Sequence, residues 1–597
     1  MRALFCLFLF LNTALNGQVT LVKGPYLQTG TPGSMIVKWE TNIKTDTKLN
    51  YGASPSFLNL SYTNSIPDTA HVAYLSGLNP HTKYYYSIGS GTATIQGDTN
   101  NYFVTSPSHG LPGKYRFWIT GDCGNASVNQ SQVRDSYISY NGNRITDGWL
   151  LLGDNAYNDG LNTEYNTNFF NYYQGNIMKK AVLWPSPGNH DYANNLVNQN
   201  SHNVAYYSIF NLPSGGEAGG VWSGTEAFYS FNYGNIHFVS LDSYGHELNQ
   251  YRLYDTLGPQ VTWLKQDLAS NSLPWVVAYW HHPPYTMASH NSDTEGELDS
   301  LRKNLVRILE RYNVDFVFCG HSHGYERSKL MNGHWGYENS FITSAHHVSS
   351  STGLYNGSVN SCPYLKNSTV RGTIYVVAGS AGALGGQQAS FPHDAMYYSN
   401  NTDGGSVVFD VEENKATVKW LCADGVIRDN FTVMKNINHV FTYSVTSGQG
   451  LNLVASWPGQ YIWSNSSDTL RSHSVVANND TVFWVKDKYS CIADTFKIKV
   501  HTGINELKNS KVGFVVFPTP SPFGPKISFD LLEEKNVSIS FYGVDGKEHF
   551  VMKNILLTAG KHVFSLESEK NIPANGVFVV KLKLDEEIYT QKAVITK

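Results

Sequence analysis

Five short apolar runs in the middle of this chain each lead, directly or through a tight turn, to a residue that can bind a metal ion. A glycine stands next to the polar residue in four of the five cases, and its missing Cβ lets the backbone turn sharply there. Strands that end on such residues gather them along one rim of a sheet, where α/β folds bind ligands. The pattern therefore predicts one site built from distant segments. The runs and the residues after them are Tyr115–Thr120 with Asp122, Trp149–Leu152 with Asp154, Ala181–Trp184 with Asn189, Trp275–Trp280 with His281, and Val314–Phe318 with His321 and His323.

The donor types indicate two transition-metal ions. A single Gly-Asp pair is more often a turn or a helix cap than a ligand, so the inference depends on all five segments together. Carboxylate, imidazole and amide groups suit iron, zinc or manganese, whereas a calcium site would be nearly all oxygen. Six such donors are more than one tetrahedral ion can bind, but they suit two ions about 3.5–4 Å apart. Such a pair stabilises both the attacking and the leaving oxygen of an in-line displacement at phosphorus. The sequence thus points to phosphoester hydrolysis.

The surroundings of these motifs predict an α/β domain. Helical periodicity at 260–268 and 297–312 alternates with the apolar strands, as in layered α/β folds, and 405–420 reads as a β-hairpin. Lys plus Arg number 43 and Asp plus Glu 47, giving a net charge of -4. That balance disfavours a protein that mainly binds nucleic-acid phosphates, and a hydrophobic content of 41% excludes general disorder.

A length of 597 residues predicts several domains. Residues 1–17 have the layout of a secretory signal peptide, one basic residue before a short apolar run, and no later segment is long and apolar enough to span a membrane. Residues 18–107 alternate like a β-sandwich in which Val37 and Trp39 face inward, and the catalytic domain covers 113–435. Two further all-β modules are expected at 440–502 and 513–597. Of the cysteines, Cys362 and Cys422 are one possible disulfide pair.

The motifs together resemble the calcineurin-like metallophosphoesterases, and within them the purple acid phosphatases. Tyr157, three residues after Asp154, is the distinguishing residue, and residues 18–107 are similar to the fibronectin-like module of plant members. The resemblance implies a central α/β four-layer β-sandwich flanked by all-β immunoglobulin- or fibronectin-like sandwiches. The segments that carry it are Asp122, Gly153-Asp154-x-x-Tyr157, Gly188-Asn189-His190-Asp191, His281-x-Pro283-x-Tyr285 and Gly320-His321-x-His323.

The same resemblance implies a role for each site residue. Fe(III) would be held by Asp122, Tyr157 and His323, and a divalent zinc, manganese or iron ion by Asn189, His281 and His321, with Asp154 bridging. His190 and His290 would contact the phosphate, as would Asn189, and could protonate the leaving alkoxide. The expected reaction is hydrolysis of small organic phosphomonoesters by a metal-activated hydroxide.

Several residues near the motifs leave alternatives open. Asn291 is expected to contact the substrate, but it stands where typical plant members carry a second histidine, which puts leaving-group protonation and substrate preference in question. Asp191 either orients His190 for catalysis or caps the following segment, with neither favoured. For His282 a packed or supporting role is favoured over a ligand role. Cys123 and Cys319, beside motif residues, are expected to be buried neutral thiols.

The last module resembles the C-terminal sorting domain of the type IX secretion system, although Pro518-Thr-Pro520 replaces the usual Pro-Asn-Pro. This implies a secreted or outer-surface protein that meets the type IX secretion machinery. Two alternatives to the phosphatase remain: a phosphodiesterase or nucleotide pyrophosphatase with the same metal core, and a surface-binding protein with a relict catalytic domain. The complete set of ligands argues against the second.

Overall fold

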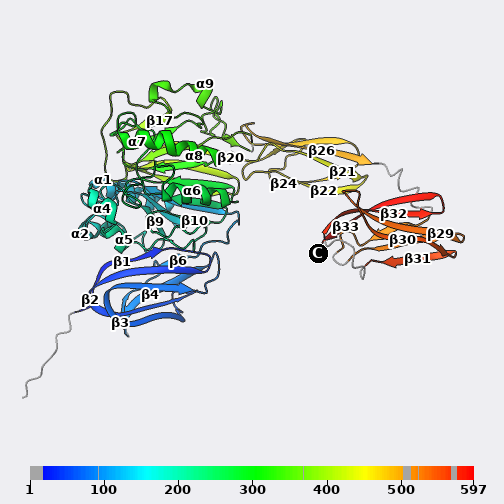
Figure 1. The fold of residues 1–597 in the computed structure, drawn as a ribbon, viewed down its shortest axis with the longest axis horizontal. Helices are drawn as coiled ribbons and strands as arrows, with labels where there is room; N and C mark the ends of the chain where they lie inside the picture. The colour runs from blue at the N-terminus through cyan, green and yellow to red at the C-terminus, as the bar shows by residue number, and fades with distance from the viewer. Residues whose placement is uncertain are drawn as a thin grey trace, which may run out of the picture. The chain divides into compact units, whose positions relative to one another are not determined.

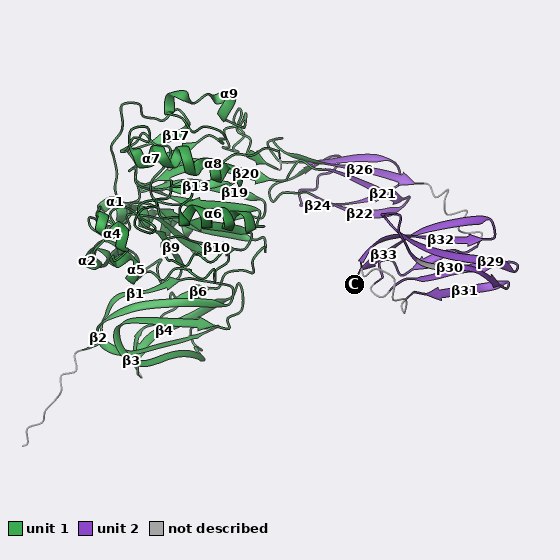
Figure 2. Ribbon diagram, in the orientation of Figure 1, with its two compact units in different colours: residues 1–439, 455–462, 486–494 green, residues 440–454, 463–485, 495–597 purple. Residues whose placement is uncertain are grey.

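The computed structural model describes residues 18–91, 93–367, 369–501, 512–521, 524–566 and 575–596. The predicted signal peptide at 1–17 lies outside these residues. The chain divides into two compact units, one formed by residues up to 439 with 455–462 and 486–494, and the other by the remainder (Figure 2). In the part of the chain that the structure describes, no helix combines the length and the apolarity needed to cross a membrane.

The N-terminal domain is all-β, and β2 is its central strand. This long strand pairs with β1 and β3 in its first half and with β3 and β4 in its second, and its register with β3 shifts between Glu40 and Thr45. Val37 and Trp39 are buried, which confirms their predicted inward orientation. The strands are β1 Leu21–Gln28, β2 Ser34–Gly52, β3 Leu60–Ser76, β4 Lys83–Ser90, β5 Ala93–Gln96 and β6 Tyr102–Val104.

This domain packs directly on the catalytic domain (Figure 1). The Leu27 amide donates to the Met178 carbonyl at 3.2 Å, and the Tyr86 hydroxyl donates to the Lys179 carbonyl at 2.8 Å. Both contacts reach the segment before β9, which leads to one of the predicted ligands. The N-terminal domain thus supports the rear of the site without contributing a ligand to it.

Two seven-stranded sheets make up the catalytic domain. Aromatic rings from both pack together, with Phe117 4.6 Å from Phe238 and Phe316 5.2 Å from Phe409 between ring centroids. The first sheet runs β15 (Tyr364–Lys366), β20 (Ile427–Lys435), β19 (Lys415–Cys422), β18 (Gly405–Glu412), β7 (Lys114–Thr120), β8 (Gly148–Leu152), β9 (Leu183–Ser186). The second runs β10 (Tyr229–Tyr233), β11 (Ile236–Ser240), β12 (Trp275–Tyr279), β13 (Phe316–Cys319), β16 (Ile374–Ala378), β14 (Tyr325–Ser328), β17 (Met396–Asn400).

The five motif strands do not share one sheet, contrary to the expectation of a single rim. β7, β8 and β9 pair in parallel in the first sheet, while β12 and β13 pair in parallel in the second. Each motif has the same local pattern, so the sequence carried no sign of which sheet a strand would join. The predicted hairpin is confirmed, because β18 and β19 pair antiparallel over their whole lengths.

Helices cover the second sheet with an apolar face. α6 (Pro259–Ser270) begins with proline in its first turn, a position where the missing N–H is tolerated. The predicted helix at 297–312 is one continuous helical segment, α7 (Gly296–Ser300), η2 (Leu301–Leu305) and α8 (Val306–Arg311), whose middle turn is a π-helix. Leu264 and Leu305 belong to the core cluster beneath these helices.

The remaining helical elements surround the site or the first sheet. α1 starts at an N-cap in which the Ser127 hydroxyl accepts from the Gln130 amide, and it contacts β18 and β19. These elements are α1 Val128–Asn141, α2 Asn162–Glu164, η1 Tyr165–Phe170, α3 Asn171–Tyr173, α4 Leu196–Ser201, α5 Ala205–Ile209, η3 Glu338–Ser340 and α9 Thr343–His346.

The disulfide differs from the pair considered above. Cys362 bonds to Cys491, whereas Cys422 is a free thiol, as are Cys123 and Cys319. The partners are 129 residues apart, so local spacing gave no means of choosing between them. Burial raises the pKa of Cys123 to about 12, as expected for a neutral thiol.

All regular elements described in the second unit are strands. β22 and β24 form one antiparallel pair, and β27, β28 and β31 form a separate three-stranded sheet. The strands are β21 Val440–Thr446, β22 Gln449–Val454, β23 Ile462–Trp463, β24 Ser472–Ala477, β25 Thr481–Lys486, β26 Ala493–His501, β27 Val515–Phe517, β28 Lys526–Leu531, β29 Lys535–Gly543, β30 Glu548–Leu557, β31 Gly560–Ser565, β32 Asn575–Leu584 and β33 Glu587–Thr596.

Candidate metal centre

The carboxyl ends of the motif strands meet where the two sheets adjoin. The Gly121 amide donates to the Ala378 carbonyl at 3.0 Å, which ties the end of β7 to the end of β16. The Gly320 amide donates to the His281 carbonyl at 3.0 Å, which ties the loops after β13 and β12. All seven predicted metal ligands are brought together by these connections.

One group, called here the tyrosine cluster, consists of Asp122, Tyr157 and His323. The Tyr157 hydroxyl lies 2.9 Å from Asp122 Oδ1 and 3.5 Å from His323 Nε2. His323 Nε2 is 3.6 Å from the same Asp122 oxygen. A phenol, a carboxylate and an imidazole therefore direct one atom each at a common point.

The second group, called here the amide cluster, consists of Asn189, His281 and His321. Asn189 Oδ1 lies 2.9 Å from His281 Nε2 and 3.1 Å from His321 Nδ1. The two imidazole nitrogens are 3.2 Å apart. Ligand atoms about 2.1 Å from one ion lie roughly 3.0–3.4 Å from each other, so this spacing matches a coordination shell.

Asp154 lies between the two clusters. Its Oδ2 is 3.3 Å from His281 Nε2, and its Oδ1 accepts from the His190 amide at 2.9 Å. Burial favours protonation of this carboxyl, but His281 and the neighbouring histidines outweigh it and hold the pKa of Asp154 well below its usual range. A buried ionised carboxylate shared by both clusters is the bridging arrangement that the sequence predicted.

Three of the ligands have left-handed backbone conformations. The φ angles are 57° at Asp122, 52° at Asp154 and 67° at His321. Such conformations are uncommon for residues with a Cβ and concentrate at functional sites, where the surrounding structure holds them. The loops after β7, β8 and β13 are thus bent to place side chains rather than to minimise backbone energy.

Two glycines are required by close approach. A Cβ on Gly188 would lie 2.3 Å from Asp154 Oδ1, and one on Gly153, where φ is +87°, would lie 2.6 Å from His281 Nδ1. Neither contact can be relieved without moving a ligand. The motif glycines therefore leave room for neighbouring ligands as well as for the turns.

The hydrogen bonds behind the ligands fix which atoms face the site. His281 Nδ1 donates to the Leu152 carbonyl at 2.8 Å, so Nε2 is the nitrogen that faces Asn189 and His321. Asn189 Nδ2 donates to Asn194 Oδ1 at 2.8 Å, which leaves its oxygen toward the cluster. Either a proton on Nε2 or a metal ion would hold these three atoms about 3 Å apart, and imidazole and amide donors suit a divalent ion.

The phenol of Tyr157 would have to lose its proton to bind a metal ion as a phenolate. Burial, followed by Asp122 and Asp154, raises its pKa well above the ordinary value. Binding of an ion at the tyrosine cluster would therefore release this proton.

His190 and His290 lie at the open side of the clusters, with side chains 27% and 29% exposed. His190 Nδ1 lies 2.6 Å from the Asn158 carbonyl, and its Nε2 is 3.9 Å from Asp154 Oδ2. The His290 ring stacks on His321 at 3.7 Å between centroids. Both rings can be reached by a substrate that also reaches the ligands.

Glu295 is a site residue that the sequence reasoning missed. Its Oε2 lies 2.9 Å from His290 Nδ1 and 3.9 Å from His321 Nε2. Burial opposes its charge, but His290, His321 and the Asn291 amide outweigh that effect and hold the pKa of Glu295 well below its usual range. Its position five residues after His290 was the only available signal, and it belongs to no ligand motif.

The structure shows the contacts of the three neighbouring residues whose roles the sequence left open. Asp191 is buried and accepts from the Tyr165 hydroxyl at 2.7 Å and the Gly188 amide at 2.8 Å, contacts that tie the loop. Asn291 Oδ1 accepts from the Asp293 and Thr294 amides, forming a turn. His282 is buried with Nδ1 2.8 Å from the Ser243 hydroxyl, although its ring nitrogen is also close enough to His281 and His321 to share an ion.

Comparisons with known proteins agree with this geometry. Residues 115–325 match the calcineurin-like phosphoesterase family, and residues 23–106 match the purple acid phosphatase N-terminal domain. Purple acid phosphatase 15 of Arabidopsis thaliana is 31% identical over 300 residues, covering 46% of this chain and 51% of that protein. Phosphoenolpyruvate phosphatase of Allium cepa is 28% identical over 331 residues, covering 52% and 62% respectively.

A solved structure extends the likeness to the fold. The purple acid phosphatase from yellow lupin (Lupinus luteus) seeds superposes with a TM-score of 0.53 at 19% identity, covering 69% of this chain and 75% of that one. The chain spans about half to three fifths of the length of the curated relatives above. Residues 115–325 and 23–106 thus match the calcineurin-like phosphoesterases and the purple acid phosphatase N-terminal domain, and the fold and the clusters at the sheet junction agree with both matches.

Proposed function

We propose that this protein is a dinuclear metal phosphatase that hydrolyses phosphomonoesters. The single observation that carries the proposal is the pair of three-donor clusters with Asp154 between them. One cluster offers a phenol and a carboxylate, and the other offers two imidazoles and an amide oxygen. Two unlike sets of donors separated by a shared carboxylate suit two unlike ions.

Each cluster has a proposed occupant. Asp122, Tyr157 and His323 would hold Fe(III), because oxygen donors stabilise a hard trivalent ion. Asn189, His281 and His321 would hold a divalent zinc, manganese or iron ion, with Asp154 bound to both. When bound, the ions would supply the Lewis acidity that generates hydroxide at neutral pH and neutralises the phosphate.

The chain's own groups complete the reaction. His290 Nδ1 is engaged by Glu295, so its proton is held toward the carboxylate and Nε2 is the nitrogen open to substrate. We assign to the doubly protonated form of His290 the delivery of its Nε2 proton to the leaving alkoxide, while Nδ1–H stays bound to Glu295. His190 is held through Nδ1 by the Asn158 carbonyl and would orient the phosphate from the opposite side. Asp191 would act indirectly, by fixing the loop that carries Asn189 and His190.

The test combines metal analysis, a visible spectrum and substrate choice. The purified protein should contain two metal ions and hydrolyse p-nitrophenyl phosphate faster than bis(p-nitrophenyl) phosphate. A visible phenolate-to-iron absorption band should disappear in Tyr157→Phe and persist in Tyr172→Phe, whose hydroxyl donates to the Ala126 carbonyl. Preference for the diester would support the phosphodiesterase alternative, and a colourless zinc or manganese protein would reject the iron assignment.

The location and the flanking modules are proposed from the sequence. Residues 1–17 would be removed as a signal peptide, and 513–597 would direct the protein through the type IX secretion machinery to the outer surface. The sheets of the second unit suit immunoglobulin-like and sorting modules, and the packing of helices on paired sheets suits the four-layer arrangement. An extracellular protein whose N-terminus is Gln18 would support export. Retention of the protein inside the cell would reject it.

A further inference from the structure

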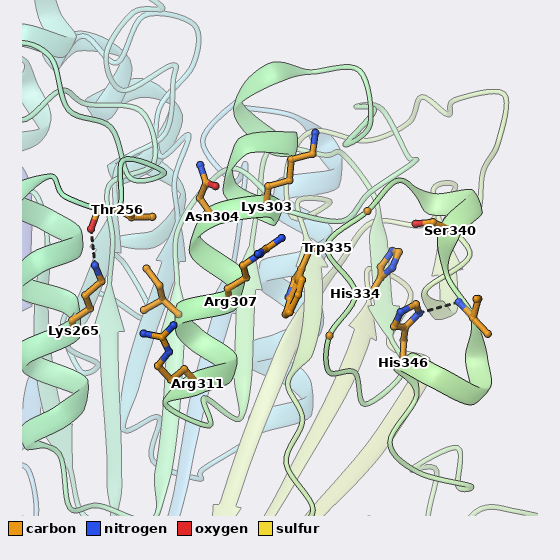
Figure 3. Close-up of a pocket in the computed structure, with 14 residues that line it drawn as sticks. Thr256, Lys265, Lys303, Asn304, Arg307, Arg311, His334, Trp335, Ser340 and His346 are labelled. Carbon is orange, nitrogen blue, oxygen red and sulfur yellow. Dashed lines mark hydrogen bonds between the residues drawn. The ribbon is translucent and has the colours of Figure 1, made fainter.

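One cavity outside the metal centre lies on the outer face of the helical layer. Its volume is about 860 Å³, and fourteen residues line it. Figure 3 shows α6, α8 and the segment 333–346 around it, with Arg307 extending toward Trp335. None of the metal ligands, nor His190, His290 or Glu295, lines this cavity. We call it the basic pocket, defined by Lys265, Lys303, Arg307, Arg311, His334 and Trp335.

Positive charge is concentrated in the basic pocket. Lysine and arginine make up 43 of the 597 residues of the chain but four of the fourteen lining residues, and no aspartate or glutamate lines it. Lys303 is paired with Asp299 at 2.6 Å. Among the residues that the structure describes, no carboxylate lies within 4 Å of the charged nitrogens of Lys265, Arg307 or Arg311. Lys265, Arg307 and Arg311 therefore make no direct ion pair among these residues, although Glu310 is near enough to Arg307 to interact with its charge.

Three lysine and arginine side chains form a row along one helical face. Lys303, Arg307 and Arg311 are spaced by four residues on the segment from η2 to α8, and all three are exposed. Asp299 offsets the charge of Lys303, and the last turn of α8 favours a cation at Arg311, so the repulsion between like charges falls mainly on Arg307. Successive side chains in the row originate about 6 Å apart along the axis, which presents their charges at regular intervals.

Two features of the opposite wall add to the charge. The Arg307 guanidinium lies over the Trp335 ring at 4.2 Å, which holds it flat at the edge of the pocket. His334 is buried, and within the described part of the chain its Nε2 has no hydrogen-bond partner. An unpaired buried nitrogen in the lining of a cavity is a position where a ligand oxygen or a water would bind.

The acids nearest to this wall are already engaged. Both oxygens of Glu310 accept from the Gly333 amide at 3.0 and 3.1 Å, and one also accepts from Trp335 Nε1 at 3.0 Å. Glu310 thus orients Trp335 and the loop. Even when the carboxylates of Asp299 and Glu310 are counted, the four lysine and arginine side chains that line the pocket leave its net charge positive.

We propose that the basic pocket binds a small molecule that carries several phosphate groups in a row, an oligophosphate, at a site separate from the metal centre. Its volume lies within the range of small-molecule sites. A row of cations about 6 Å apart matches a ligand with repeated anionic groups better than a single orthophosphate, and arginine suits phosphate oxygens through paired N–H groups. The site does not depend on the proposed hydrolysis.

The test measures binding of inorganic tripolyphosphate to the metal-loaded full chain by calorimetry. Saturating orthophosphate is present to occupy the metal centre. The wild type should bind one tripolyphosphate per chain, and Arg307→Gln with Arg311→Gln should weaken this affinity at least about thirtyfold. Hydrolysis of p-nitrophenyl phosphate should change less than twofold, so loss of the pocket and loss of the proposed function remain distinguishable.

A matched control removes the same charge elsewhere. Lys44→Gln with Lys48→Gln on β2 should leave tripolyphosphate affinity within twofold of the wild type. ATP serves as a second ligand: equal affinity would mean that the phosphates alone are recognised, and tighter binding lost in Trp335→Ala would mean that the ring adds a contact. Wild-type affinity in the Arg307/Arg311 variant would overturn the proposal. So would binding of a sulfated polysaccharide, without tripolyphosphate, through the same residues.

Discussion

The metal centre and the basic pocket lie in the same domain, and each is suited to phosphate by opposite means. The metal centre gathers buried carboxylates and lone pairs, which attract an anion only after metal ions have bound. The basic pocket presents exposed cationic side chains and needs no metal. The first depends on strained loops from two sheets, whereas the second depends on one helical face and its neighbours. A protein with a net charge of -4 can therefore still contain sites suited to anions.

The largest expected effect is the loss of activity when the bridging carboxylate is removed, which should leave the basic pocket unaffected. Asp154→Asn should lower kcat for p-nitrophenyl phosphate by about a thousandfold or more, because the ions contribute several kcal/mol and each 1.4 kcal/mol is about tenfold. Metal content should fall in parallel. Tripolyphosphate affinity at the basic pocket should stay within twofold, and Asp135→Asn on α1 should change neither property. Full activity in Asp154→Asn would remove the basis of the comparison.

Glu295→Gln should have the next largest effect on the metal centre. Loss of this carboxylate frees His290 Nδ1 and the edge of His321, and groups that support metal ligands typically contribute about ten- to a hundredfold. We expect kcat to fall by that factor. The pH–rate profile should also shift, because Glu295 contacts the proposed proton donor His290. Glu217→Gln, an exposed carboxylate, is the control. An unchanged profile would show that Glu295 serves only the local turn.

The wall of the basic pocket should make stability depend on pH through Glu310. Burial raises its pKa from an ordinary value of 4.5 to about 7, against the opposing hydrogen bonds from Gly333 and Trp335. Below pH 4.5 both the folded and unfolded states are protonated, and between 4.5 and 7 only the unfolded state releases the proton. Stability therefore falls as the pH rises through this window, by at most about 3 kcal/mol. Urea unfolding measured at several pH values should show that the free energy of unfolding of Glu310→Gln falls less between pH 4.5 and 7 than that of the wild type.

The smallest expected effect concerns the row of cations itself. Arg311→Gln removes one like-charge pair at a spacing of four residues, but it also removes a cation that the last turn of α8 favours, so the free energy of unfolding should change by less than about 0.5 kcal/mol at low salt. Any change should disappear at high ionic strength, because salt screens exposed charges. Thermal unfolding at two salt concentrations measures it. A larger loss of stability in Arg311→Gln would mean that the row supports the helix, which would weaken the inference of a ligand.

Local patterns predicted the secondary structure around the site well, and the long-range connections poorly. The helices at 260–268 and 297–312, the 405–420 hairpin and the buried Val37 and Trp39 follow from periodicity, which records which face of an element is apolar. The disulfide partner of Cys362 and the division of the motif strands between two sheets do not follow from it. The disulfide joins residues 129 positions apart, and the division of the strands depends on which strands pair, for neither of which does one chain carry a local signal.

The sequence by itself determined the kinds of donor and their order. Asp122, Asp154, Asn189 and the three histidines were predicted because metal chemistry limits which side chains can serve and where a strand can deliver them, and Tyr157 and the division into two sets around Asp154 were predicted from the resemblance to the purple acid phosphatases. Only the tertiary structure decided that the donors come from two sheets, that Glu295 holds His290, and that Lys265 and Trp335 line one cavity with the row on η2 and α8. Distance in space is set by how the sheets pack and the loops cross, and no spacing along the chain encodes it.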